Sequence, residues 1–146
     1  MVEPQPIDYH FRRKRLDWPL HVTILPWFTV IEKSVALDDI KQVITDTHSF
    51  ELIIGPEELF GETKVNLIGQ PGKVEALHET LLEVSANNIV FSKDPEWIGN
   101  QYRPHVTHHG AERLYEGDTV TVGAVTIVQL IPNNMCQVID TIHLKV

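Results

Sequence analysis

One triplet, His-Val-Thr, occurs twice in this chain, at residues 21–23 and again at residues 105–107. With 8 His among 146 residues, and with Val and Thr as frequent as they are here, the triplet is expected only about 0.07 times by chance. On a β-strand, residues i and i+2 point to the same side, so each triplet would present its imidazole and hydroxyl together and turn its valine into the core. Two such strands brought together would surround a space the size of a phosphate. This arrangement predicts metal-free phosphodiester chemistry.

Length and charge restrict the classes of protein that the chain can belong to. Its 146 residues, 42% hydrophobic and 22% charged, fit one domain over residues 1–146, of which residues 1–8 are expected to be loose. A net charge of −8 argues against binding to duplex DNA, because that binding requires many Lys and Arg to neutralise phosphates. A small nucleotide or an RNA end needs only a local positive pocket. The cluster at residues 12–15, Arg-Arg-Lys-Arg, either supplies that potential or is a solvated charge run.

The compartment is predicted from cysteine usage and from the absence of targeting signals. Cys136 is the single cysteine, so an intrachain disulfide cannot form and a cysteine-based structural zinc site is not expected. The first residues lack the basic start and apolar core of a signal peptide, and no run approaches the roughly 20 apolar residues of a membrane span. We therefore expect a soluble cytoplasmic protein that does not enter membranes, and a monomer is favoured.

Apolar periodicity predicts a mixture of strands and two amphipathic helices. Helices are expected at 34–47 and from Pro71-Gly72 to Asn87-Asn88, the second with His78 and Glu79 facing solvent. Turns are expected at Gly55-Pro56, near Gly61 and at Asn133-Asn134, with a bulge at Gly123. Strands are expected at 20–30, with Pro26 marking its end or an edge position, and at 50–54, 63–68, 89–91, 120–131 and 137–146. Each half then has one helix and one His-Val-Thr strand, 84 positions apart, which suggests an internal duplication.

Two His-x-Thr triplets in this element order, with Pro104 just before the second one, resemble the two-histidine (2H) phosphoesterase superfamily, and most closely its LigT-like branch of 2′-5′ RNA ligases and cyclic phosphodiesterases. The resemblance runs from about Leu16 to the C-terminus. It implies an α+β fold of two pseudo-symmetric lobes of antiparallel strands with outer helices and an active-site groove between them. Two features depart from the family pattern: His108-His109 replace apolar residues after the second triplet, and residues 9–16 make a poor first strand.

The resemblance implies hydrolysis of 2′,3′-cyclic phosphates, 2′,5′-linkages or related cyclic nucleotides and RNA ends, without a metal or other cofactor. Phosphodiester cleavage needs one proton removed from the nucleophile and one given to the leaving oxygen, and two imidazoles can do both. By analogy with the family, His105 is the general base and His21 the general acid. Thr23 and Thr107 would donate hydrogen bonds to the non-bridging oxygens as charge builds on them.

Three residues before the second triplet are candidates for substrate binding. Arg103 would reach the phosphate if the strand runs regularly through Pro104. Tyr102 and Trp97 could each stack on a base, since such stacking tolerates any nucleobase, or they could pack over the edge of the core.

Other functions compete with this interpretation. A metal site could use His105, His108 and His109, although no His-Glu-x-x-His pattern accompanies them. A catalytically silent protein that binds a nucleotide or RNA end would have less need of two titrating imidazoles, and the RNA 2′,5′-ligase direction would use the same residues in reverse. A Cys136 or serine nucleophile is set aside because neither residue type lies in a recognisable nucleophile motif.

Overall fold

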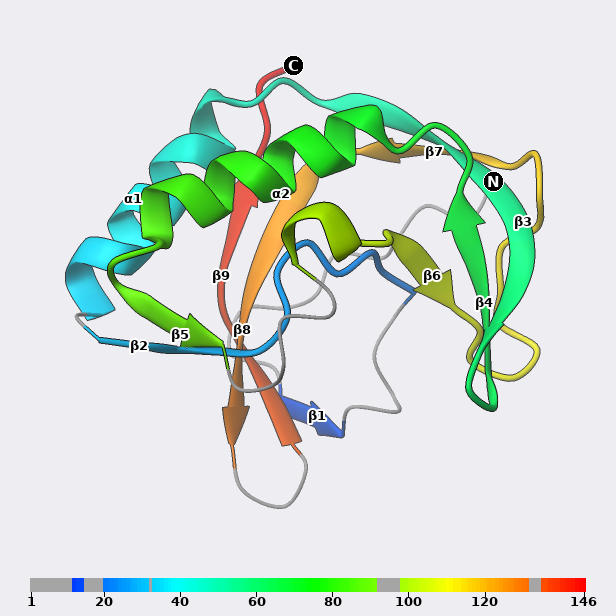
Figure 1. The fold of residues 1–146 in the computed structure, drawn as a ribbon, viewed down its shortest axis with the longest axis horizontal. Coiled ribbons are helices and arrows are strands. Elements are labelled where there is room, and N and C mark those ends of the chain that lie inside the picture. The colour runs from blue at the N-terminus through cyan, green and yellow to red at the C-terminus, as the bar shows by residue number, and fades with distance from the viewer. Residues whose placement is uncertain (1–11, 15–19, 32, 92–97, 132–134) are drawn as a thin grey trace.

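A computed structural model of residues 1–146 describes residues 12–14, 20–31, 33–91, 98–131 and 135–146. Within these residues the strands form three antiparallel sheets, with strand orders β1-β9-β8, β2-β5 and β6-β4-β3-β7. The sheets curl into a half-barrel, as Figure 1 shows, and the α+β antiparallel architecture predicted from the sequence is confirmed. The strands are β1 Arg12–Lys14, β2 Phe28–Val30, β3 Phe50–Phe60, β4 Thr63–Ile68, β5 Ile89–Phe91, β6 His105–Thr107, β7 Thr119–Val122, β8 Ala124–Ile131 and β9 Met135–His143.

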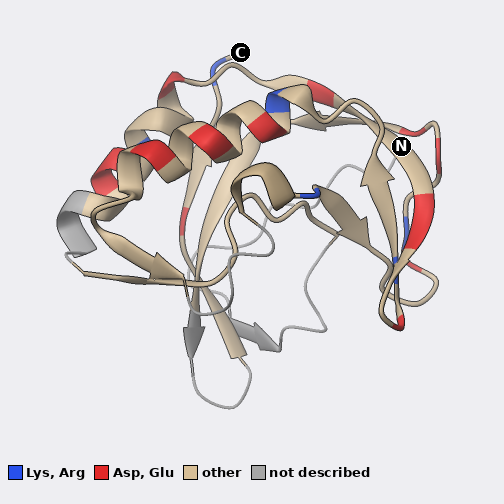
Figure 2. Ribbon diagram, viewed as in Figure 1, with Lys and Arg blue, Asp and Glu red and all other residues tan. Residues whose placement is uncertain are grey.

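The two helices, α1 Lys33–Asp46 and α2 Gly72–Ser85, pack against each other over one side of the sheets (Figure 1). Both form where apolar side chains recur every three or four residues, and these side chains are buried in the main core with residues of β3, β4 and β6. Acidic residues run along both helices (Figure 2). None of the helices in the described ranges is long and apolar enough to cross a membrane. The buried helix positions include Ala36, Ile40, Ile44, Val74, Leu77 and Leu81.

The expected strand at 20–30 is wrong as a single element. Only β2 is a regular strand, and before it Val22 makes an isolated antiparallel bridge with Val106. Pro26 lies between the two paired stretches, and proline has no N–H to donate to a ladder. The first triplet therefore lies on an irregular segment attached to a sheet edge.

The turn expected at Gly55-Pro56 is also wrong, because β3 runs through it to Phe60. Pairing with β4 shifts register between Ile54 and Glu57, so the glycine and proline are absorbed in a bulge. Glycine suits this position because a Cβ on Gly55 would stand 3.0 Å from the carbonyl oxygen of Leu67. The turn expected near Gly61 is present, with Gly61 at a φ of 63°.

The expected strand at 120–131 is divided at Gly123. The part before it, β7, pairs with β3, whereas the part after it, β8, pairs with β9. Gly123 thus marks the point where the chain passes from one sheet to another. Residues 1–8 and the expected turn at Asn133-Asn134 lie outside the described residues.

Candidate active site

The two triplets lie side by side. Val22 pairs with Val106 in an antiparallel bridge, and in that register residue 21 lies opposite residue 107 while residue 23 lies opposite residue 105. Val106 is 3% exposed and Val22 packs on the same core. Side chains alternate along an extended chain, so the histidine and threonine of each triplet point away from the core. These four residues, His21, Thr23, His105 and Thr107, therefore share one side of the pairing. Each histidine is thereby placed beside the threonine of the other triplet.

The ring of His105 is fixed by two contacts. Its Nδ1 lies 2.8 Å from the carbonyl oxygen of Arg103, and a carbonyl can only accept, so Nδ1 carries the proton. The ring also meets Phe60 edge-on, with centroids 4.7 Å apart and planes at 69°. In the neutral imidazole the lone pair is therefore on Nε2, which is the form that a general base requires.

Arg103 lies on the same side as His105, because the pairing with β4 continues through Pro104, whose carbonyl accepts the N–H of Ile68 at 3.2 Å. The guanidinium lies 5.1 Å from the centre of the Phe60 ring and forms an ion pair with Glu58 at 2.7 Å. Sequence reasoning missed Phe60, which is 45 positions away from His105, and no local signal connects the two.

A buried histidine holds the first triplet in place. His78 on α2 is 0% exposed, so the expectation that it faces solvent is wrong. Its Nδ1 donates to the carbonyl of Ile24 at 2.6 Å, and its Nε2 accepts the N–H of Gly99 at 3.0 Å. Burial lowers the pKa of His78, which the hydrogen bond to Ile24 and the nearby Glu79 and Glu75 only partly oppose. The neutral form is also the one that both hydrogen bonds require.

Tyr102 completes this support. Its ring stacks on His78 at 3.9 Å between centroids, and its hydroxyl donates to the carbonyl of Thr23 at 2.7 Å. Burial, with the charge of Glu75 acting in the same direction, raises the pKa of the Tyr102 hydroxyl well above its usual range. One face of the Tyr102 ring therefore packs on His78, and its hydroxyl is bonded to the backbone of the first triplet. The other aromatic candidate, Trp97, lies outside the described residues.

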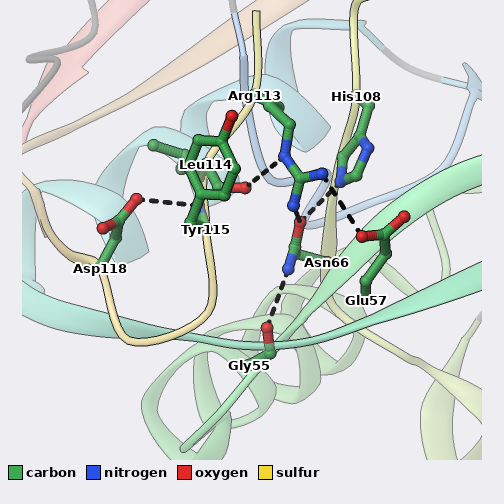
Figure 3. A network of polar contacts seen from close by, with 8 residues as sticks. All are labelled: Gly55, Glu57, Asn66, His108, Arg113, Leu114, Tyr115 and Asp118. Carbon is green, nitrogen blue, oxygen red and sulfur yellow. Dashed lines mark hydrogen bonds and ion pairs between the residues drawn. The ribbon is translucent and has the colours of Figure 1, made fainter.

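His108 points to the opposite side of β6 from His105. It donates through Nε2 to Oδ1 of Asn66 at 2.6 Å, and Asn66, which is 1% exposed, donates to the carbonyl of Gly55 at 2.9 Å (Figure 3). Arg113 joins this network 3.5 Å from the same Oδ1 and forms an ion pair with Glu57 at 3.3 Å. Partial burial, and then the charge of Arg113, lower the pKa of His108. His108 therefore links the chain just after β6 to Asn66 on β4, on the side away from His105.

His109 lies two residues beyond Thr107, and its ring stands edge-on to His21 with centroids 6.4 Å apart and planes at 61°. Its Nδ1 is buried and has no hydrogen-bond partner among the described residues. The metal alternative would need His105, His108 and His109 to converge, but His108 is turned away from the other two. Across the described ranges, no three His, Cys, Asp or Glu side chains gather in a group that could hold a metal ion.

Comparison with known proteins shows the family of the chain. A family model described as the 2'-5' RNA ligase superfamily matches residues 2–116, a span that contains both triplets. No curated protein matches the chain. The superfamily is known for phosphoesterase and ligase activity. Because the match covers well over half of the sequence, the chain belongs to the 2'-5' RNA ligase superfamily, the LigT-like 2H phosphoesterases.

Proposed function

We propose that this protein is a metal-independent phosphodiesterase that acts on 2′,3′-cyclic phosphate, 2′,5′-linked or related cyclic nucleotide and RNA-end substrates. The observation that carries the proposal is the Val22–Val106 pairing, whose register gathers two imidazoles and two hydroxyls on one side of adjacent chain segments. Membership of a superfamily with phosphoesterase and ligase activity supports the same class of reaction.

In the proposed reaction His105 acts as the general base and His21 as the general acid. Water attacks phosphorus while Nε2 of His105 takes its proton, and His21 gives a proton to the leaving ribose oxygen as the P–O bond breaks. The hydrogen bond from Nδ1 of His105 to the Arg103 carbonyl supports this assignment, because it keeps the Nε2 lone pair available in the neutral ring. The same residues with exchanged roles would run the ligation direction.

Thr23 and Thr107 are proposed to bind the non-bridging phosphate oxygens through their hydroxyl groups. Each lies beside the histidine of the other triplet, so each hydroxyl faces a phosphate held between the two rings. Removal of one such donor costs about 2.7 to 4 kcal/mol of transition-state stabilisation, or about a hundred- to thousandfold in kcat.

Arg103 is proposed to bind the substrate phosphate. For this the guanidinium would give up its ion pair with Glu58. Both side chains of this ion pair are substantially exposed, at 46% and 39%, and such surface pairs contribute only about 0 to 1 kcal/mol. A doubly or singly charged phosphate is therefore a competitive partner for the guanidinium. The acidic net charge of −8 favours small substrates over long nucleic acids.

The proposal is tested by hydrolysis of a panel of 2′,3′-cyclic nucleotides, 2′,5′-linked dinucleotides and cyclic dinucleotides in excess EDTA. The wild type is compared with His21→Ala and His105→Ala, and His48→Ala, an exposed histidine outside the triplets, serves as the matched control. We expect turnover that survives chelation, persists in the control and falls at least a hundredfold in both triplet variants. Turnover abolished by EDTA, or unaffected by either triplet variant, would contradict the mechanism. Tight binding of one panel member without turnover would instead identify a nucleotide-binding protein.

A further inference from the structure

Two aromatic rings from outside the triplets contact the two histidines of the site in the same manner. Phe60 meets His105 edge-on at 4.7 Å between centroids, and His109 meets His21 edge-on at 6.4 Å. The interplanar angles are 69° and 61°. Edge-to-face contacts at such distances are a favoured geometry for aromatic pairs, because the positive edge of one ring meets the negative face of the other.

Neither imidazole lies on a long regular strand, and that of His105 has a hydrogen bond to the backbone, from Nδ1 to the Arg103 carbonyl. His21 lies on an irregular segment that is bound to β6 by the isolated Val22–Val106 bridge, and its side chain is exposed. His105 begins a strand of only three residues. An exposed histidine such as His21 can take several rotamers, and the contact with a neighbouring ring favours one of them. For the half-buried His105, the ring of Phe60 acts together with the hydrogen bond to Arg103.

His109 is well placed to orient His21, because two hydrogen bonds with Glu112 hold the His109 backbone. The His109 N–H donates to the Glu112 carbonyl at 2.9 Å, and the Glu112 N–H donates back at 3.1 Å, with Gly110 turning the chain at a φ of 63°. Nδ1 of His109 has no hydrogen-bond partner among the described residues. The described contact with His21 is between the two rings, and a phenyl ring can reproduce a contact of that shape.

Phe60 is held in a comparable way on the other side of the site. It ends β3 beside the Gly61 turn, pairs with Thr63 on β4, and carries the Arg103 guanidinium 5.1 Å from its ring centre. The ring thus contacts both the Arg103 guanidinium and the His105 imidazole. Its position beside His105 is set by the sheet and not by a loop.

We infer that Phe60 and His109 are positioning residues, one for each imidazole, and that they hold His105 and His21 in the rotamers that face a bound phosphate. This inference rests on the proposed function for its kinetic consequence, but the ring orientation that it describes exists without substrate. His109 stands where an apolar residue is usual after the second triplet, and its ring contacts His21 of the first triplet.

The kinetic test compares alanine variants with variants that keep a ring. His109→Ala and Phe60→Ala are expected to lower kcat about 10- to 100-fold with KM within about twofold, because a small misplacement of a catalytic group is costly while uniform binding is kept. His109→Phe and Phe60→Tyr are expected to retain kcat within about threefold of wild type. Leu59→Ala, on the same strand and 60% exposed, and His143→Ala, also exposed, are the matched controls.

A second readout does not depend on activity. In NMR spectra of the substrate-free protein, the imidazole signals of His21 should broaden or move toward rotamer-averaged values in His109→Ala and stay in place in His109→Phe. Phe60→Ala should do the same to His105. Unchanged imidazole signals in the alanine variants, or equal kcat for the alanine and ring-keeping variants, would overturn the inference. An inactive wild type with the expected NMR changes would refute the proposed function alone.

Discussion

Replacing His78 with leucine should weaken the fold and loosen the first triplet, because this side chain joins α2 to the segment that carries the site. The change removes the hydrogen bonds to the Ile24 carbonyl and from the Gly99 N–H, and it removes the stack on Tyr102. Each hydrogen bond contributes about 1 kcal/mol and an aromatic pair about 0.5 to 1.5 kcal/mol. The expected loss is thus about 2 to 4 kcal/mol, a large part of the roughly 5 to 15 kcal/mol typical of a domain.

Urea unfolding at pH 7.5, followed by far-UV circular dichroism, measures this loss. Two further variants divide it: asparagine at position 78 can still donate to Ile24, and glutamine can still accept from Gly99, so each should lose less than leucine does. A loss below about 1 kcal/mol for His78→Leu, or an equal loss for all three variants, would refute the reasoning.

The same residue makes stability depend on pH in a defined direction. Burial lowers the pKa of His78 in the folded protein from the ordinary value of 6.5, so protons bind the unfolded chain more readily. The stabilising contribution is fully present above pH 6.5 and is lost as the pH falls from there through the folded-state pKa. His78→Leu should therefore lose less stability than wild type between pH 7.5 and pH 5.5. Parallel losses in the two proteins would contradict this assignment.

Three further predictions follow from individual contacts. Glu58→Gln should lower KM severalfold by releasing Arg103 for the substrate, and an unchanged KM in steady-state assays would exclude that contact. His108→Leu should lower the free energy of unfolding by about 1 to 3 kcal/mol yet leave kcat/KM of the folded protein near wild type, in contrast to His105→Ala. Gly55→Ala should lower the melting temperature, because its Cβ would stand 3.0 to 3.1 Å from backbone atoms of neighbouring residues, and an unchanged melting temperature would show that the bulge adapts.

The burial of His78 could have been predicted from its position in the helix. His78 falls four residues after Val74 and three before Leu81, which places it on the buried side of α2 by helical spacing alone. Polarity led to the opposite expectation, but a histidine with two hydrogen-bond partners can be buried. Pro26, expected to mark the end of the strand at 20–30 or an edge position, does separate its two paired stretches.

Other features had no such signal. Phe60 lies 45 positions from His105 and becomes its neighbour only through the pairing of β3 with β4 and of β4 with β6. The passage of β3 through Gly55-Pro56 likewise depends on a register shift against a partner strand. Sequence alone does not specify which strands become neighbours or in which register, because pairing energy is gained only when distant segments meet.

The sequence by itself determined the two helices, most strands, the α+β architecture and the superfamily, because apolar periodicity and two identical triplets are properties of short segments. Only the tertiary structure decided that Val22 pairs with Val106 and that each triplet histidine lies beside the other triplet's threonine. It also turned His109 toward His21 and His108 toward Asn66. Alternation along a strand determines which residues share a side. Which of the two sides faces the site is decided by tertiary packing, because the core covers the opposite side.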